Sequence, residues 1–402
     1  MINLEVPKKA GALINQAYQA AAEVFRPISR KYDRAEHTYP SELDMFAALL
    51  DGLNSSGEGG AGAAGVRRSG SDDSAKGNRN GANLNVVLGT IEMCWGDVGL
   101  LLSMPRQGLG NAAISSVATD EQLERFSGMW AAMAITEPGF GSDSAAVSTT
   151  ARLDGDHYVL NGEKIFVTSG ERADAVVVWA TLDKSKGRAA IKSFVVEKGT
   201  PGFEVVRTEH KLGIRASDTA VLRFENCRVP RENLLGTPEI NTATGGFAGV
   251  MQTFDNTRPL VAAMAIGVAR AALEETKRIL TEAGITIDYD RPANSQHAAA
   301  AEFLRLEADY ESAYLLTLES AWMADNRQPN SLQASMAKAK AGRSVVEIAL
   351  KCVELTGAYS EESLLEKWAR DAKILDIFEG TQQIQQLIVA RRVLGLSSNE
   401  LR

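Results

Sequence analysis

The sequence has few residues of the kinds that build disulfide, metal or nucleic-acid sites. Its 402 residues include 3 cysteines, far apart, and 4 scattered histidines, so neither a disulfide framework nor a metal cluster is expected. The formal net charge is −8, without a lysine- and arginine-rich stripe, which argues against nucleic acid as the main partner. No apolar run approaches the ~18 residues of a membrane span, and the first residues lack the apolar core of a signal peptide. We therefore expect a cytoplasmic protein, and 45% hydrophobic residues indicate that it is globular.

The spacing of apolar residues divides the chain into three parts. Residues 1–130 show helical spacing, interrupted at 54–80 by glycine, serine, alanine and charged residues that predict a mobile loop. Residues 131–238 carry short strand-like runs, and residues 239–402 return to helical spacing. Because the chain is too long for one simple core, we predict an α+β fold: an N-terminal helical domain, a middle antiparallel β-barrel or sandwich, and a C-terminal four-helix bundle.

Turn and cap residues predict the ends of several elements. The dipeptides Asp154-Gly155 and Asn161-Gly162 each separate strand-like runs and predict two hairpins. Pro259 is expected in the first turn of the first bundle helix. The other three bundle helices are expected over about 297–325, over about 331–355 and after Thr381.

The predicted loop also contains a pattern typical of dinucleotide-binding proteins. Residues 60–65 read GAGAAG and fit G-x-G-x-x-G. No strand-like run precedes them, and residues 66–71 are a poor helix start. Without a helix N-terminus there is no aligned set of N–H groups for a pyrophosphate, so a Rossmann fold is not expected.

A lone carboxylate, Glu379, lies between Phe378 and Gly380 just before the apolar residues 382–394. An aromatic neighbour that partly desolvates a carboxylate raises its pKa toward that of a useful base. A following glycine lets the backbone approach a ligand. The alternative is that Glu379 only stabilises the positive end of the next helix.

Four segments occur in a fixed order along the chain. They are TEPGFGSD (136–143), KIFVTSG (164–170), FDNTRP (254–259) and RDAKILDIFEGTQQIQQLIVAR (370–391). With helical, β and helical parts in the same order, the chain strongly resembles the acyl-CoA dehydrogenase family over nearly its whole length, most weakly across 54–80. The resemblance implies FAD as cofactor and an acyl-CoA thioester as substrate.

The resemblance also implies a role for Glu379. Its carboxylate would take the α-proton of the thioester while the β-hydrogen leaves as hydride to flavin N5, giving the 2-enoyl-CoA. The N–H of Glu379 and a ribityl hydroxyl would stabilise the charge that develops on the thioester oxygen. Some relatives carry the base on the helix equivalent to 245–254, but no acid occurs there before Asp255, which favours Glu379.

The same resemblance implies a set of flavin-binding residues. Hydroxyl donors and glycines in TEPGFGSD would meet the isoalloxazine and the pyrophosphate, although taken alone this segment could be an ordinary turn after a strand. Phe166 would pack on the flavin, where the family usually has tryptophan, and Thr168 would hydrogen-bond its ring. The expected cofactor-binding residues are Met133, Ile135, Thr136, Gly141, Ser142, Phe166, Thr168, Thr381 and Gln383.

A further set is expected on the substrate side. Arg258 resembles a structural and substrate-side arginine, and Arg391 lies where the family approaches CoA, with a solvated helix face as the alternative. The expected substrate-binding residues are Ser142, Asp255, Arg258, Gly380 and Arg391.

The chain departs from the family in the half of the FAD site that a neighbouring subunit contributes. In homotetrameric members that subunit donates an arginine and a glutamine; here Thr286 and Glu354 stand at those positions, Tyr289-Asp290 replaces a Phe-Gly pair, and Ala358 replaces a glycine. An ionised glutamate cannot donate to phosphate and repels it. We therefore expect a tetramer with a related subunit that donates the missing contacts, as in the paired dehydrogenase subunits of actinobacterial lipid and sterol degradation. The alternative is a homotetramer with other donors.

Three functional classes follow. The first is an acyl-CoA dehydrogenase of fatty-acid or sterol side-chain β-oxidation that passes electrons to an electron-transfer flavoprotein. The second is a flavoprotein of the same fold with other chemistry, such as an acyl-CoA oxidase or a monooxygenase, although monooxygenase relatives usually lack the glutamate. The third is a partner subunit without catalysis, which the retained Glu379 and TEPGFGSD disfavour.

Overall fold

The computed structural model describes residues 2, 4–8, 10–47, 81–106, 109–240, 248–360, 362–397 and 400–401, and only the backbone of 248–256. The loop predicted at 54–80, with its GAGAAG pattern, lies outside these residues. Along the chain the described parts comprise N-terminal helices, a sheet and C-terminal helices, which confirms the predicted α+β fold class.

Helices of the N-terminal part lead into one buried helix. α1 (Ala10–Ala20) continues through a π-helical turn into α2 (Arg26–Arg34). α4 (Ala82–Leu102) packs against α1 and against α7 (Ala248–Glu282) of the C-terminal part. Contrary to the expectation from sequence, α4 is long and apolar enough to cross a membrane, but 89% of its apolar window is buried inside the protein, as in a core helix. The short helices α5 (Leu109–Val117) and α6 (Asp120–Arg125) lead to the sheet.

The middle part is a seven-stranded curled sheet in the order β1-β4-β2-β3-β7-β6, with β5 paired to β4. Most neighbours are antiparallel, but β1 pairs with β4 in parallel, so the sheet is mixed and not wholly antiparallel. The strands are β1 (Ala131–Ala134), β2 (Thr150–Asp154), β3 (His157–Thr168), β4 (Ala175–Thr181), β5 (Ile191–Glu197), β6 (Phe203–Thr208) and β7 (Thr219–Pro230).

Only one of the two predicted hairpins forms. β2 and β3 turn at Gly155, whose φ is 64°, as predicted. The second dipeptide, Asn161-Gly162, instead lies inside β3, where the pairing with β7 shifts register between Leu160 and Gly162. The prediction was wrong because β3 keeps pairing with β7 on both sides of this bulge, so the chain does not reverse.

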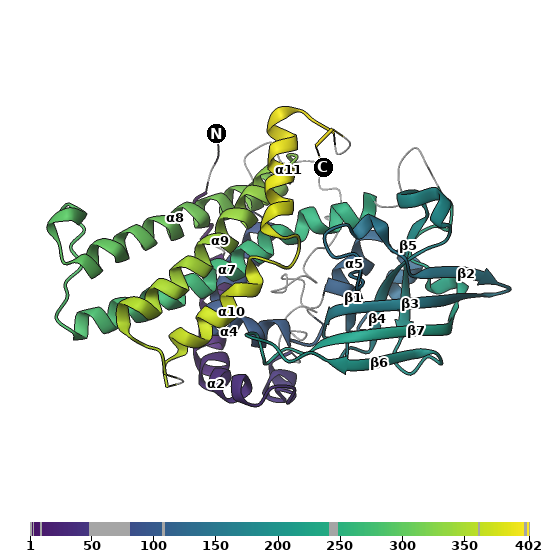
Figure 1. The fold of residues 1–402 in the computed structure, drawn as a ribbon, viewed down its shortest axis with the longest axis horizontal. Coiled ribbons are helices and arrows are strands. Elements are labelled where there is room, and N and C mark those ends of the chain that lie inside the picture. The colour runs from purple at the N-terminus through teal and green to yellow at the C-terminus, as the bar shows by residue number, and fades with distance from the viewer. Residues whose placement is uncertain are drawn as a thin grey trace.

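The C-terminal part contains one helix more than predicted. α7 (Ala248–Glu282), α8 (Ala298–Asp325), α9 (Ser331–Thr356) and α11 (Gln382–Leu394) match the predicted four, but α7 begins earlier, so Pro259 lies inside it. The additional helix, α10 (Leu364–Leu375), is capped by Ser363, whose hydroxyl accepts a hydrogen bond from the N–H of Leu365 at 3.1 Å. In Figure 1 the long helices lie on one side of the molecule and the sheet on the other.

Buried charges fix α10 against both other parts. Lys367 on α10 donates to Asp97 on α4 at 2.7 Å and to Asp371 at 2.6 Å. Asp371 also accepts a hydrogen bond from the N–H of Ile214, between β6 and β7, at 2.6 Å. Since Glu379 follows α10 directly, these contacts set its position relative to the sheet.

Candidate active site

The TEPGFGSD loop follows β1 and is held by a buried ion pair. The Glu137 carboxylate accepts the backbone N–H groups of Ser148 and Thr149 at 2.7 and 2.9 Å, and both hydroxyls as well. Lys164, from KIFVTSG on β3, pairs with Glu137 at 2.8 Å, and both side chains are buried. The N–H of Ile165 donates to the carbonyl of Thr136 at 2.9 Å. The two predicted flavin-binding segments therefore lie side by side.

The ion pair and its burial shift the pKa values of Glu137 and Lys164 by different causes. Burial alone would raise the pKa of Glu137, but the charge and hydrogen bonds of Lys164, with those of Ser148 and Thr149, lower it to about 2. Burial lowers the pKa of Lys164 to about 8 although Glu137 acts to raise it. Glu137 is thus an ionised structural group at neutral pH and not a base. The sequence analysis did not single out either residue.

Phe166 is presented to solvent by a bulge in β3. The pairing with β7 shifts register between Lys164 and Val167, and Phe166 has a left-handed φ of 58°. Its side chain is 63% exposed, which is unusual for phenylalanine within a strand. An exposed aromatic face beside a rigidly held loop fits the flat ring system of FAD.

The other predicted cofactor residues divide between two places. Thr136, Gly141 and Ser142 lie on the loop after β1, where Gly141 and Ser142 are exposed. Thr381 and Gln383 instead begin α11: the Thr381 hydroxyl accepts a hydrogen bond from the N–H of Ile384 at 3.4 Å, and Gln383 is exposed. The structure places the remaining three at the end of β1 and in β3: half-buried Met133, Ile135 and Thr168.

Glu379 has a strained backbone conformation, and the residue is half-buried. Its φ is 55° and that of Gly380 is 96°, both left-handed. The hydroxyl of Thr257, on α7, donates to the Glu379 carboxylate at 3.0 Å. Burial raises the pKa of Glu379, while the Thr257 hydrogen bond and the charges of Arg258 and Lys338 oppose the rise. A carboxylate in such surroundings has the properties of a general base.

The backbone around Glu379 presents a donor to a ligand. The N–H of Phe378 donates to Ile374 at 3.0 Å, and that of Gln382 to Asp376 at 3.2 Å. Within the part of the chain that the structure describes, the N–H of Glu379 has no such partner. It is therefore available to an oxygen of a bound substrate.

The helix-cap alternative for Glu379 does not agree with these contacts. Thr381 is the N-cap of α11, and its side chain accepts the hydrogen bond that a cap requires. The Glu379 carboxylate is bound to Thr257 on α7 instead.

The predicted substrate residues have varied surroundings. Arg258 is buried, with its charge acting on both Glu379 and Lys338. The Asp255 side chain lies outside the described residues. Arg391 is half-buried and donates to the carbonyl of Leu401 at 2.7 Å, so it holds the C-terminal segment and does not form a solvated face.

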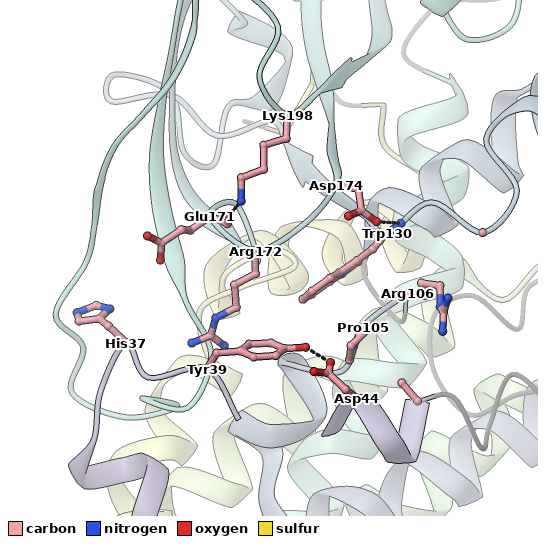
Figure 2. Close-up of a pocket in the computed structure, with 12 residues that line it drawn as sticks. His37, Tyr39, Asp44, Pro105, Arg106, Trp130, Glu171, Arg172, Asp174 and Lys198 are labelled. Carbon is pink, nitrogen blue, oxygen red and sulfur yellow. Dashed lines mark hydrogen bonds between the residues drawn. The ribbon is translucent and has the colours of Figure 1, made fainter. Parts of the chain in front are cut away.

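A separate pocket of about 730 Å³ lies at the other end of β1 and β4 (Figure 2). Its polar groups mainly satisfy one another: Tyr39 donates to Asp44, Asp174 accepts the N–H of Trp130 at 2.9 Å, and Lys198 donates to the carbonyl of Glu171. None of the predicted site residues lines it. This pocket therefore does not belong to the candidate active site.

The structure also brings together two histidines that are distant in sequence. The Nδ1 atom of His210 lies 3.0 Å from the Glu36 carboxylate and 3.3 Å from Nε2 of His37. Their ligand atoms could hold a metal ion by distance, but His210 is 85% exposed. Glu36 also accepts the N–H of Lys211 at 2.7 Å, so the cluster ties the loop after α2 to the loop after β6.

Comparisons with known proteins agree with this arrangement. Residues 132–227 match the model of the acyl-CoA dehydrogenase middle domain, and residues 244–394 match that of the acyl-CoA dehydrogenase C-terminal domain. The mitochondrial short-chain specific acyl-CoA dehydrogenase of Rattus norvegicus is 40% identical over 273 residues. That match covers 65% of this chain but only 62% of the relative's length.

Two further likenesses cover more of the molecule. The short-chain specific acyl-CoA dehydrogenase of Clostridium acetobutylicum is 35% identical over 306 residues, covering 74% of this chain and 78% of the relative. The butyryl-CoA dehydrogenase structure from Megasphaera elsdenii superposes with a TM-score of 0.80 at 27% identity, covering 98% of this chain and 100% of the other. The chain belongs to the acyl-CoA dehydrogenase family.

Proposed function

We propose that this chain is an FAD-dependent acyl-CoA dehydrogenase that converts an acyl-CoA thioester into the 2-enoyl-CoA. The proposal rests on the environment of Glu379. Burial raises the pKa of its carboxyl group, its backbone is left-handed, and its N–H group is available to a ligand. Relatives named as short-chain acyl-CoA dehydrogenases support the class of substrate.

The residues of the chain would share the work in a defined way. The Glu379 carboxylate takes the α-proton, and the Thr257 hydroxyl holds that carboxylate in place. The N–H of Glu379 donates to the thioester oxygen as negative charge develops on it. Thr136, Ser142, Phe166 and Thr168 would hold FAD, which would supply the acceptor for the β-hydrogen and its electron pair, transferred together as a hydride. The α-proton and the β-hydride together account for the new carbon–carbon double bond.

The wider setting is part of the same proposal. It comprises fatty-acid or sterol side-chain β-oxidation in the cytoplasm, with an electron-transfer flavoprotein as the acceptor. An acyl-CoA oxidase of the same fold is the second candidate. Dehydrogenase and oxidase can share the same base and differ in whether oxygen reaches the flavin. Rapid reoxidation of the reduced protein by air would favour the oxidase.

The variant Glu379→Gln tests the assigned base. It keeps the size and hydrogen-bonding ability of the side chain but cannot take a proton, so reduction of bound flavin by butyryl-CoA should fall by about 10²–10⁴-fold. The parent and variant proteins are both prepared with added FAD, and their flavin content, measured by visible absorption, should be the same. Glu282→Gln, at the exposed end of α7, is the matched control and should retain full activity. Undiminished reduction in Glu379→Gln would refute the proposal.

A further inference from the structure

Lys338 is a buried cation with no surface role. It lies on α9, which packs against α7, α10 and α11, and its side chain is 0% exposed. Its ammonium group donates to the backbone carbonyl of Gly380, the residue after Glu379, at 2.8 Å. A lysine ammonium is strongly hydrated and is costly to bury without a directly paired carboxylate. Stability therefore does not explain why a lysine stands at this position.

The carbonyl that Lys338 binds belongs to the strained turn of the candidate active site. Glu379 and Gly380 are both left-handed, and an L-residue adopts that conformation only where surrounding contacts impose it. The buried side-chain amide of Gln385 donates to the carbonyl of Glu379 at 3.1 Å and, at 3.3 Å, to that of Gly380. The backbone carbonyls of Glu379 and Gly380 are thus both hydrogen-bonded, the first by Gln385 and the second by Lys338 and Gln385.

Lys338 also acts on Glu379 through its charge. Burial lowers the pKa of Lys338 to about 8, while Asp376 and Glu379 act to raise it and Arg258 acts to lower it. In the other direction, the positive charges of Arg258 and Lys338 oppose the rise that burial causes in the pKa of Glu379. Four charged groups from three segments therefore share one buried region, with Lys338 at its α9 side.

We propose that Lys338 is a positioning residue for Glu379, which holds the left-handed turn through the Gly380 carbonyl and supplies buried positive charge that favours the ionised Glu379 carboxylate. The inference rests on the proposed function, because it gives Lys338 a purpose only if Glu379 is the base. Lys338 would touch neither substrate nor flavin and would act through Glu379.

Two substitutions separate the hydrogen bond from the charge. Lys338→Met removes both, whereas Lys338→Gln keeps a donor for the carbonyl and removes only the charge. Lys340→Met is the matched control on the same helix, since Lys340 is half-exposed and pairs with Asp309 at 2.5 Å. The rate of flavin reduction by butyryl-CoA is measured against pH for each protein, prepared with added FAD.

Loss of the cation makes the ionised carboxylate less favourable, so the pKa of Glu379 should rise further. The rate profile should then move to higher pH by about one unit or more in both Lys338 variants. On the acid side of the profile, below the pKa of Glu379, this means a loss of about tenfold that higher pH restores. Lys338→Met should be slower than Lys338→Gln even at high pH, because it also releases the turn. Lys340→Met should leave the profile unchanged.

Two readouts that do not depend on turnover distinguish positioning from a structural role. Because the buried ammonium is costly, Lys338→Met should unfold at the same temperature as the parent chain or higher. The Glu379 carboxyl, followed by NMR of isotope-labelled glutamate in the flavin-free chain and identified with Glu379→Gln, should titrate at higher pH in Lys338→Gln. If Lys338→Met does not fold, the titration in Lys338→Gln still tests the proposal.

The outcomes separate the two proposals. An unchanged rate profile and carboxyl titration in Lys338→Gln, with Glu379→Gln inactive, would overturn the role of Lys338 alone. Retained reduction in Glu379→Gln would overturn the proposed function itself. A lowered unfolding temperature with an unmoved titration would assign Lys338 to stability.

Discussion

Two carboxylates of this protein, Glu137, which is buried, and Glu379, which is half-buried, have opposite environments. Glu137 is surrounded by a cation and four hydrogen-bond donors from Ser148 and Thr149, and its pKa falls to about 2. Among the residues that the structure describes, Glu379 accepts a hydrogen bond from one hydroxyl, that of Thr257, and burial raises its pKa. Glu137, with more donors, stays ionised as a structural anion, whereas Glu379, with fewer, has the properties of a base. Enzymes that use two carboxylates in different roles show the same contrast of environments.

The Glu137–Lys164 pair should make stability depend on pH in the acid range. The folded-state pKa of Glu137, about 2, lies below its ordinary 4.5, so its contribution is complete above 4.5 and is lost as pH falls toward 2. The shift corresponds to about 3 kcal/mol. Urea unfolding of the parent chain and of the double variant Glu137→Gln/Lys164→Met, compared from neutral pH to about pH 3, should show this loss in the parent only.

The single variant Lys164→Met provides the contrast at neutral pH. It leaves the Glu137 carboxylate buried without its cation and should cost about 3–5 kcal/mol of unfolding free energy. The double variant should recover much of that cost, because neither partner is then an unpaired charge. If both variants unfold at the same urea concentration, the pair does not hold the loop.

At the scale of the element, strand β3 decides the geometry of the flavin side. It contains two register shifts against β7, one at Gly162 and one that presents Phe166. Gly162 has φ 155°, and a Cβ there would lie 2.3 Å from the Thr149 hydroxyl oxygen. Because that hydroxyl donates to Glu137 at 2.6 Å, the bulge is coupled through one contact to the TEPGFGSD loop.

This coupling predicts the effect of adding one methyl group. Gly162→Ala should displace Thr149 and lower the unfolding free energy by about 2 kcal/mol or more, and flavin content should fall with it. Gly155→Ala is the control: its φ of 64° is also left-handed, but a Cβ there meets nothing within 4 Å. It should cost only about 1 kcal/mol and retain flavin. Equal losses of flavin in both variants would contradict the coupling.

The same strand shows how far the sequence could predict the structure. Local signals sufficed for the Gly155 hairpin and for most helices, because turns and apolar spacing act over a few residues. Asn161-Gly162 gave the same local signal as a hairpin, and only the pairing with β7, about sixty residues later in the chain, overrides it. The helix α10 was missed although its cap, Ser363, was readable.

Site residues follow a similar division. Glu379 and Phe166 lie within motifs that could be recognised in the sequence. Thr257 and Lys338 could not be assigned to Glu379 from local pattern, because they come from α7 and α9, and only helix packing brings them to the turn. A lone lysine at helical spacing gives no sign that it is buried.

At the scale of the whole molecule, one buried cation joins three parts of the chain. Lys367 pairs with Asp97 and Asp371, and all three side chains are at most 1% exposed. Asp371 binds the N–H of Ile214, so α4, α10 and the β6–β7 connection meet at this point. The relative placement of sheet and bundle, on which a flavin site between them depends, is therefore held by charge as well as by apolar packing.

The surface that would meet a neighbouring subunit gives the remaining argument. Thr286 is exposed, and Glu354 is 62% exposed with a salt bridge to Lys351 at 2.7 Å. A glutamate that faces a pyrophosphate repels it and provides no donor. We propose that a related subunit supplies these contacts, so that each FAD is shared between unlike chains.

The chain purified alone should therefore hold well under one FAD per polypeptide, measured by visible absorption, and co-expression with a related subunit should restore about one per pair. The double variant Thr286→Arg/Glu354→Gln changes the net charge by two units at the proposed contact and should raise flavin content in the isolated chain. Thr281→Arg/Glu282→Gln makes the same charge change at exposed positions at the end of α7 and serves as control. A yellow protein with full flavin content from the parent chain alone would instead establish a self-sufficient homo-oligomer, because copies of this chain would then satisfy each other's FAD sites without the donated arginine and glutamine.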